Sequence, residues 1–281
     1  MSERTTKAAA IAVGVFAAAL TLANAVLLVL GRETLNTDEA DLFFGALTAL
    51  GGALYVAIGL LIAVGAQSVI GWFLAAVGVW YLLLAFGTAY GAVGIATYPG
   101  SLPAAEEVAT LFSQSWVFAL VTLTMLLLLF PDGRPPSPRW RPVLWLAAGG
   151  AVSSFILFLL KAAPVEPIAG IRFPNPFAVP SLAGFVGPAL VAAARATVIG
   201  VVGCFAGLIV RYRRGDRELR QQIRWLGLVA ADGAACVLIS LASLVACGCD
   251  ETVVTVVAFT GLVFIILIEA IGRADAPSAS R

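Results

Sequence analysis

Histidine is absent from this sequence of 281 residues, and charged residues make up only 12% of it. Without histidine the chain lacks the commonest general base and the commonest metal ligand. Soluble domains usually carry about 25% charged residues, whereas 61% of this chain is hydrophobic and its mean hydropathy is +1.00. The composition therefore predicts a protein solvated by lipid, without metal, cofactor or enzymatic activity.

Cysteine is also scarce, and its four positions contain no CxxC pair. Cys204 and Cys236 lie in apolar runs, which favours small core residues. Cys247 and Cys249 form a C-G-C sequence, in which a bridge between the two would be strained. Unpaired small residues are the simplest interpretation, while a disulfide of another kind and a redox or metal role stay open.

Long apolar runs occupy most of the chain, and a membrane-spanning helix needs about 20 such residues. Because a helix in lipid is apolar all round, length rather than periodicity identifies it, and no alternating barrel strands occur. We expect an all-α fold, a polytopic transmembrane helical bundle of about eight helices in a single membrane domain, 1–281. The expected spans are 8–30, 42–65, 70–94, 108–130, 142–161, 184–210, 225–247 and 252–272.

Two of these boundaries need an argument. The run 8–30 is too long for the apolar core of a signal peptide, so it is interpreted as a retained first helix. The stretch 42–94 carries no charge near its middle, but a single helix over it would be about 80 Å long. Two spans joined by a tight turn at Gln67 and Ser68 are expected instead.

The charged residues predict the topology. Eight spans place 13 of the 17 basic residues on one side, with the termini and the loops 131–141 and 211–224. The opposite loops are acidic and hold only three basic residues, Arg32, Lys161 and Arg172. Basic loops stay in the cytoplasm, so we predict a multi-pass protein of the cell (plasma) membrane with both termini cytoplasmic.

The longest outer loop, 162–183, contains five prolines, which favour an extended and semi-rigid path. Its apolar side chains Ile168, Ile171, Phe173 and Phe177 are expected either to lie back on the membrane surface or to cap the bundle. An ordered connector is favoured over a lid that gates a ligand.

Three stretches carry a resemblance to a known family. Residues 129–143 read LFPDGRPPSPRWRPV, residues 211–215 read RYRRG, and residues 220–226 read RQQIRWL. Together with IGWF at 70–73 and YPGSLP at 98–103, their order resembles the N-terminal membrane region of actinobacterial sensor histidine kinases, over about residues 40–270. This resemblance implies a sensory or input module. The chain has neither a phospho-acceptor histidine nor a nucleotide-binding domain, so kinase activity is not implied.

Arginines gather at the loops predicted to be cytoplasmic. Gly133 suits a positive-φ turn after Pro131 ends a helix, and Trp140 and Trp145 suit the headgroup layer. A helix starting near Asp216 would stack arginines on one face. Contact with anionic lipid headgroups explains this pattern, and docking of an acidic partner, such as a kinase or another signalling protein, is the alternative; nucleic acid is not expected. The arginines concerned are Arg134, Arg139, Arg141, Arg213, Arg217, Arg220 and Arg224.

Three ionisable residues fall inside expected spans. Glu269 stands four residues before Arg273, which suits a pair at the interface. Arg195 and Asp232 lie deeper, where lipid exposure costs at least about 2.5 kcal/mol each. We expect both to face the bundle interior, as a pair or around a shared polar cavity, with a structural and a functional role both open.

Two functions remain after these exclusions. A membrane-embedded sensor or regulatory module without a catalytic domain, coupled to a separate protein, follows from the resemblance and the arginines. The alternative is a small-molecule or ion transporter, which Arg195 and Asp232 favour. The lack of an internal repeat and of broken helix pairs argues against a transporter, and the lack of a carboxylate cluster argues against an intramembrane enzyme.

Overall fold

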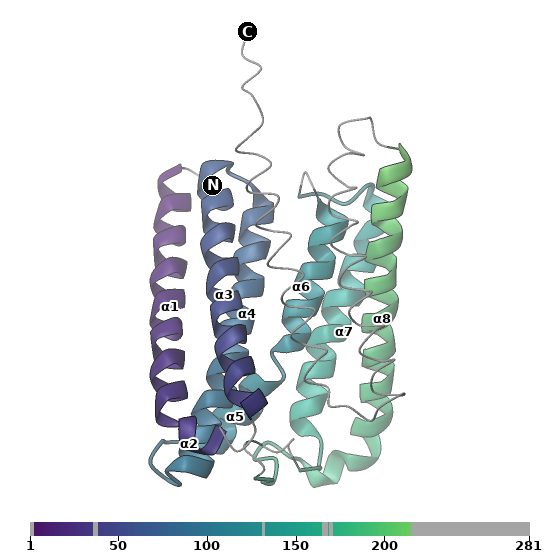
Figure 1. The fold of residues 1–281 in the computed structure, drawn as a ribbon. Coiled ribbons are helices and arrows are strands. Elements are labelled where there is room, and N and C mark those ends of the chain that lie inside the picture. The colour runs from purple at the N-terminus through teal and green to yellow at the C-terminus, as the bar shows by residue number, and fades with distance from the viewer. Residues whose placement is uncertain (1–2, 36–38, 131–132, 165–167, 169–170, 215–281) are drawn as a thin grey trace. The chain divides into compact units, whose positions relative to one another are not determined.

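The computed structural model describes residues 3–35, 39–130, 133–164, 168 and 171–214. Contacts divide the chain into a unit of Met1–Val210, which holds nearly all of these residues, and a second unit of Arg211–Arg281. The described residues are all-helical, as expected (Figure 1). The helices are α1 (Glu3–Leu30), α2 (Arg32–Leu35), α3 (Glu39–Gly65), α4 (Val69–Gly91), α5 (Ala105–Ser113), α6 (Trp116–Leu129), α7 (Arg141–Leu160) and α8 (Ala183–Arg214), with a π-helix η1 (Ala92–Thr97) and 3₁₀ turns η2 (Pro138–Trp140) and η3 (Pro180–Leu182).

Six helical stretches in this part of the chain are long and apolar enough to cross a membrane. They coincide, within a few residues at each end, with the first six expected spans. Their outward side chains suit lipid: Ile11 and Leu22 on α1 are about two-thirds exposed, at 67% and 68%. The expected seventh and eighth spans, 225–247 and 252–272, lie outside the described residues, so the count of eight stays a prediction.

The expected turn between the second and third spans is confirmed. α3 ends at Gly65, and Gln67 takes a positive φ of 48°. Ser68 then caps α4, because its Oγ accepts a hydrogen bond from the backbone N–H of Ile70 at 3.2 Å. Three residues therefore suffice to reverse the chain.

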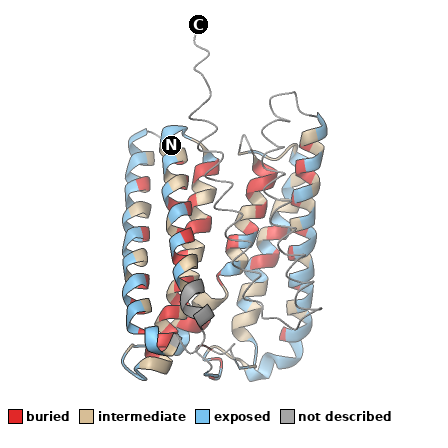
Figure 2. Cartoon of the chain, viewed as in Figure 1, coloured by how far each residue is buried: buried red, intermediate tan, exposed pale blue. Residues whose placement is uncertain are grey.

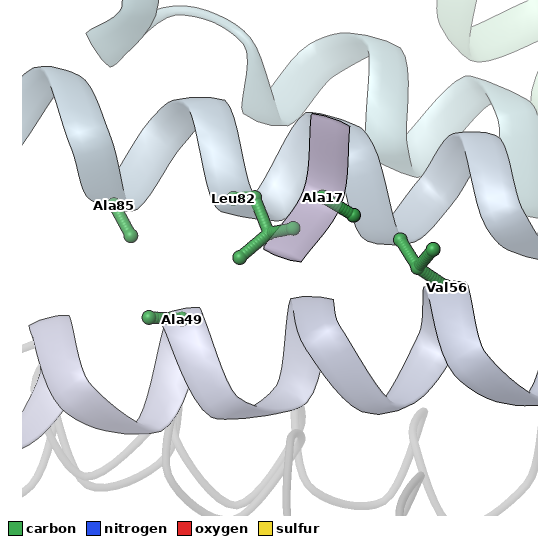
Figure 3. Close-up of a cluster of buried hydrophobic side chains, with 5 residues drawn as sticks. All are labelled: Ala17, Ala49, Val56, Leu82 and Ala85. Carbon is green, nitrogen blue, oxygen red and sulfur yellow. The ribbon is translucent and has the colours of Figure 1, made fainter. Parts of the chain in front are cut away.

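Close packing of small residues holds α1, α3 and α4 together. Their buried positions lie along the faces where the helices meet (Figure 2). One core cluster combines side chains of all three helices (Figure 3): Ala17, Ala49, Val56, Leu82 and Ala85. Membrane helices gain little from hydrophobic burial against one another, so van der Waals contact between closely spaced backbones is the main source of their association.

Glycine makes the approach of α3 and α4 possible. A Cβ atom on Gly59 would lie 2.7 Å from the carbonyl oxygen of Gly71, and a Cβ on Gly71 would lie 2.5 Å from that of Gly59. Gly52 and Gly78 face each other in the same way about two turns further along, seven residues from the first pair on each helix. Backbone therefore meets backbone over much of this interface.

A second group of contacts joins α6, α7 and α8. Val121 of α6 packs with Ala147 and Ala151 of α7. The backbone of Gly200 on α8 lies against Ala147, and Gly150 on α7 lies against Thr197. Small residues again set the spacing between the helices.

The interhelical contacts show which loops lie together at each end of the helices. At one end the hydroxyls of Thr34 and Thr97 lie 2.6 Å apart, and Ile168 packs on Gly91. At the other end Gly133 packs on Val69. The first end holds the loops that are predicted to be outside, and the second holds loops predicted to be cytoplasmic.

Which end faces the cytoplasm can be tested with single cysteines in a chain whose four native cysteines are replaced. We expect Glu107→Cys to react with a membrane-impermeant maleimide in intact cells. Ser137→Cys is expected to react only after the membrane is opened, since basic loops stay inside. Labelling of Ser137→Cys in intact cells with protection of Glu107→Cys would reverse the topology.

One expected span is not a single helix. The segment 108–130 is expected as one span, and Ala105–Leu129 is one stretch long and apolar enough to cross a membrane, but it consists of two helices, α5 and α6, interrupted at Gln114 and Ser115. At the interruption the buried Ser115 side chain donates to the carbonyl oxygen of Trp80 on α4, at 3.2 Å. This partner is 35 residues away in the sequence, so the sequence of the segment alone does not identify it.

Candidate functional site

The loop 133–141 presents arginines at the end predicted to be cytoplasmic. Gly133 has a φ of +69°, as expected for the turn after α6. Arg134, Arg139 and Arg141 are all exposed around the short helix η2. Trp145, one turn into α7, is 76% exposed. An exposed indole beside several guanidinium groups suits the layer of lipid headgroups.

The remaining predicted arginines belong to the second unit. Arg213 and Arg214 are exposed at the end of α8. Arg217, Arg220 and Arg224 lie outside the described residues. Their stacking on one helical face therefore stays a prediction.

One of the three ionisable candidates within the expected spans, Arg195, lies in the described part of the chain. Arg195 is exposed on α8, on a helix that also exposes Val191, Val198 and Ile199. Asp232 and Glu269 lie outside the described residues. The expected interior position of Arg195 and its pairing with Asp232 involve that later segment, and both stay predictions.

Uncharged polar side chains are buried between the helices. Asn24 of α1 is fully buried, and its Nδ2 donates to the carbonyl oxygens of Leu20 at 3.0 Å and of Leu82, on α4, at 3.2 Å. Tyr55 of α3 is 1% exposed and stacks on Tyr81 of α4, with 6.2 Å between ring centroids. The Oδ1 of Asn24 and the hydroxyl of Tyr55 are buried without a hydrogen-bond partner. Hydrogen bonds of this kind between membrane helices contribute about 0.6 kcal/mol on average.

The interruption between α5 and α6 adds a polar patch within a stretch that is long and apolar enough to cross a membrane. Thr110 and Ser115 are buried, and Ser113 and Gln114 are half-buried between them. Thr110 and Ser113 donate to carbonyl oxygens of α5 itself, those of Glu106 and Thr110. Irregular backbone at membrane depth is tolerated only where protein buries it or where it lines a cavity, so this patch is the strongest candidate site in the described residues.

The proline-rich loop caps the end of α4 and α5, which was one of the two alternatives expected for it. Ile168 and Phe173 are buried in a cluster with Ala92 and Ala109, whereas Ile171 is exposed. Asn175 fastens the loop to α7, because its Nδ2 donates to the carbonyl oxygens of Leu159 and Lys161, both at 2.9 Å.

Beneath this cap α4 ends in the π-helix η1. The hydroxyl of Thr97 donates to the carbonyl oxygen of Ala92 at 3.1 Å. The same hydroxyl forms a hydrogen bond with the hydroxyl of Thr34. A π-helical turn is rare and often marks a functional position. Nothing in the sequence singled out η1, but the run Ser113-Gln114-Ser115 was a visible signal for the interruption of the next span.

The buried patches between the helices offer hydrogen bonding by amides and hydroxyls, and the exposed loop 133–141 offers guanidinium groups. The described residues contain no group of three or more metal-ligating side chains. One ion pair in the same residues joins the ammonium of Lys7 to the carboxylate of Glu3, one turn apart on α1, at 2.6 Å. No protein-family model, curated protein or solved structure matches this chain.

Proposed function

We propose that this protein is a membrane-embedded sensor or regulatory module that passes a signal to a separate protein. The main support is the resemblance of the segments 129–143, 211–215 and 220–226 to the membrane region of sensor histidine kinases. The observation that fits it best is the loop 133–141, a turn that exposes Arg134, Arg139 and Arg141 beside Trp145. Such a surface can meet anionic lipid headgroups and an acidic partner with the same guanidinium groups.

A small-molecule or ion transporter is the second candidate, and the interrupted span favours it. Discontinuous helices near the middle of the membrane form substrate and ion sites in many transporters. α5 and α6 are such a pair, with Thr110, Ser113, Gln114 and Ser115 at the interruption. A kinase or response regulator encoded beside this chain would favour the signalling function over transport.

The signalling proposal is tested by replacing Arg217, Arg220 and Arg224 together with glutamine. Each basic residue next to the membrane contributes about 1 kcal/mol near an anionic surface, so we expect roughly 100-fold weaker retention of anionic lipid or of a co-purifying partner. Lipid and protein that co-purify from native membranes are measured by mass spectrometry.

The matched control removes the same number of charges from the opposite end, by replacing Arg32, Lys161 and Arg172 with glutamine. This variant is expected to retain the wild-type lipids and partner. If both triple variants behave like the wild-type chain, the arginines have no such role, and a loss of equal size in both would show that only net charge matters.

A further inference from the structure

The interruption between α5 and α6 lies well inside the membrane. The span Ala105–Leu129 counts as one crossing of 25 residues. Its last charged residue at the outer end is Glu107, so Gln114 lies seven residues, or about 10 Å, further in. A hydrocarbon core about 30 Å thick places this position at membrane depth from either side.

The backbone at the interruption forms a tighter turn than an α-helix. The N–H of Ser115 bonds to the carbonyl oxygen of Phe112, and the N–H of Phe118 bonds to that of Ser115, each at 3.0 Å and three residues apart. Gln114 has a φ of −92° and a ψ of 0°, outside the α-helical region. A short 3₁₀ stretch within a helix often marks a hinge.

The hydrogen bond from Ser115 to Trp80 ties this turn to α4. The Oγ of Ser115 donates to the carbonyl oxygen of Trp80, and Ser115 is only 2% exposed. The neighbouring Trp80 ring packs on Phe118, with 4.8 Å between ring centroids. The turn is therefore a fixed point on α4, with one helix leading away from it in each direction.

Both helices beyond this point pack on α4, but on different stretches of it and with different additional neighbours. Ala105 and Ala109 of α5 lie on Gly94 and Gly91, under the cap formed by Ile168. α6 packs on the stretch of α4 around Trp80 and also on α7, through Val121 and through Phe118, whose ring lies 4.9 Å from that of Phe155. A displacement of α5 therefore changes its contacts with the cap, with η1 and with the end of α4, whereas the contacts of α6 with α7 and with Trp80 can stay in place.

We propose that Gln114 and Ser115 form a hinge about which α5 tilts relative to α6, so that changes at the proline-rich cap reach the middle of the membrane. A tilt of about 20°, the size of a marked helix kink, moves the far end of α5 by about 5 Å, because the helix is about 13 Å long. The hinge follows from the local geometry and serves a sensor or a transporter equally.

The hinge is tested by distances between two spin labels in the full-length chain with its four native cysteines replaced. One pair, Glu107→Cys and Leu120→Cys, spans the interruption on exposed positions. The reference pair, Ala12→Cys and Ala25→Cys, has the same separation of 13 residues on exposed positions of the continuous helix α1. We expect the first pair to show a distance distribution several ångströms broader than the reference pair.

Removing the tie to α4 sharpens the test. Ser115→Ala is expected to broaden the 107–120 distribution further, while Ser113→Ala, whose hydroxyl bonds within α5, should leave it unchanged. A 107–120 distribution as narrow as that of the α1 pair would overturn the hinge, and so would one that Ser115→Ala leaves unaltered. If Ser115→Ala fails to fold, the comparison of the 107–120 and 12–25 distance distributions in the otherwise wild-type chain still tests the hinge.

Discussion

Replacing Gly71 with leucine is expected to cost about 3 kcal/mol of stability or more and to separate α3 from α4. A Cβ atom at this position would lie 2.7 Å from the Cα of Ala63 and 2.5 Å from the carbonyl oxygen of Gly59. Overpacking usually costs 1–3 kcal/mol because side chains can shift to relieve it. Here the atoms in the way belong to the backbone of α3, so the whole helix has to move.

The measurement is thermal unfolding of the purified protein in detergent, with Gly149→Leu as the matched control. Gly149 also lies within a helix long and apolar enough to cross a membrane, α7, but a Cβ there meets nothing within 4 Å. The control is expected to be neutral or stabilising, because glycine inside a helix costs about 0.5–1 kcal/mol relative to alanine. Equal losses in the two variants would mean that the close contact of α3 with α4 does not limit stability.

Replacing Asn175 with alanine is expected to cost about 2–3 kcal/mol and to release the proline-rich loop from α7. The side chain donates to the carbonyl oxygens of Leu159 and Lys161, and its Oδ1 accepts from the backbone N–H of Phe177 at 3.0 Å. Leaving buried groups without partners costs about 1–3 kcal/mol. Faster proteolysis within 162–182 and a lower unfolding temperature would report the loss.

Asn175→Asp keeps the size of the side chain but removes its N–H donors, so this variant isolates the contribution of the hydrogen bonds to stability. At neutral pH its carboxylate would face two carbonyl oxygens, so Asn175→Asp is expected to be less stable than Asn175→Ala. Protonation would relieve the repulsion, and the aspartate variant is expected to recover stability as the pH is lowered. Ser181→Ala, at an exposed position in the same loop, should behave like the wild-type chain. Identical stability of all three variants would contradict an anchoring role for Asn175.

Much of the fold could be predicted because length alone identifies a span in lipid. The tight turn at Gln67 and Ser68 followed from the same argument, since one helix over 42–94 would have been far too long. Gly133 was predicted because a positive φ suits the turn after a helix that Pro131 ends. These features depend on a few neighbouring residues, which the sequence displays directly.

The features that escaped prediction depend on contacts between distant segments. Ser115 interrupts its span because it finds the carbonyl oxygen of Trp80 on another helix. Ile168 and Phe173, but not Ile171, are buried against Ala92 and Ala109, which belong to segments far away in the sequence. The candidate site was therefore predicted less well than the fold, since its chemistry arises where separate helices meet.

The short connection between α3 and α4 has a consequence for how the protein is made. Only residues 66–68 separate the two helices, so the entropy lost on closing this loop is small, and contacts between near neighbours form early in folding. Glycines facing each other across the pair allow it to close without any other part of the chain. Once both segments have left the ribosome, they can enter the bilayer as one helical hairpin, and α1 and the later helices can then assemble on a surface that is already complete.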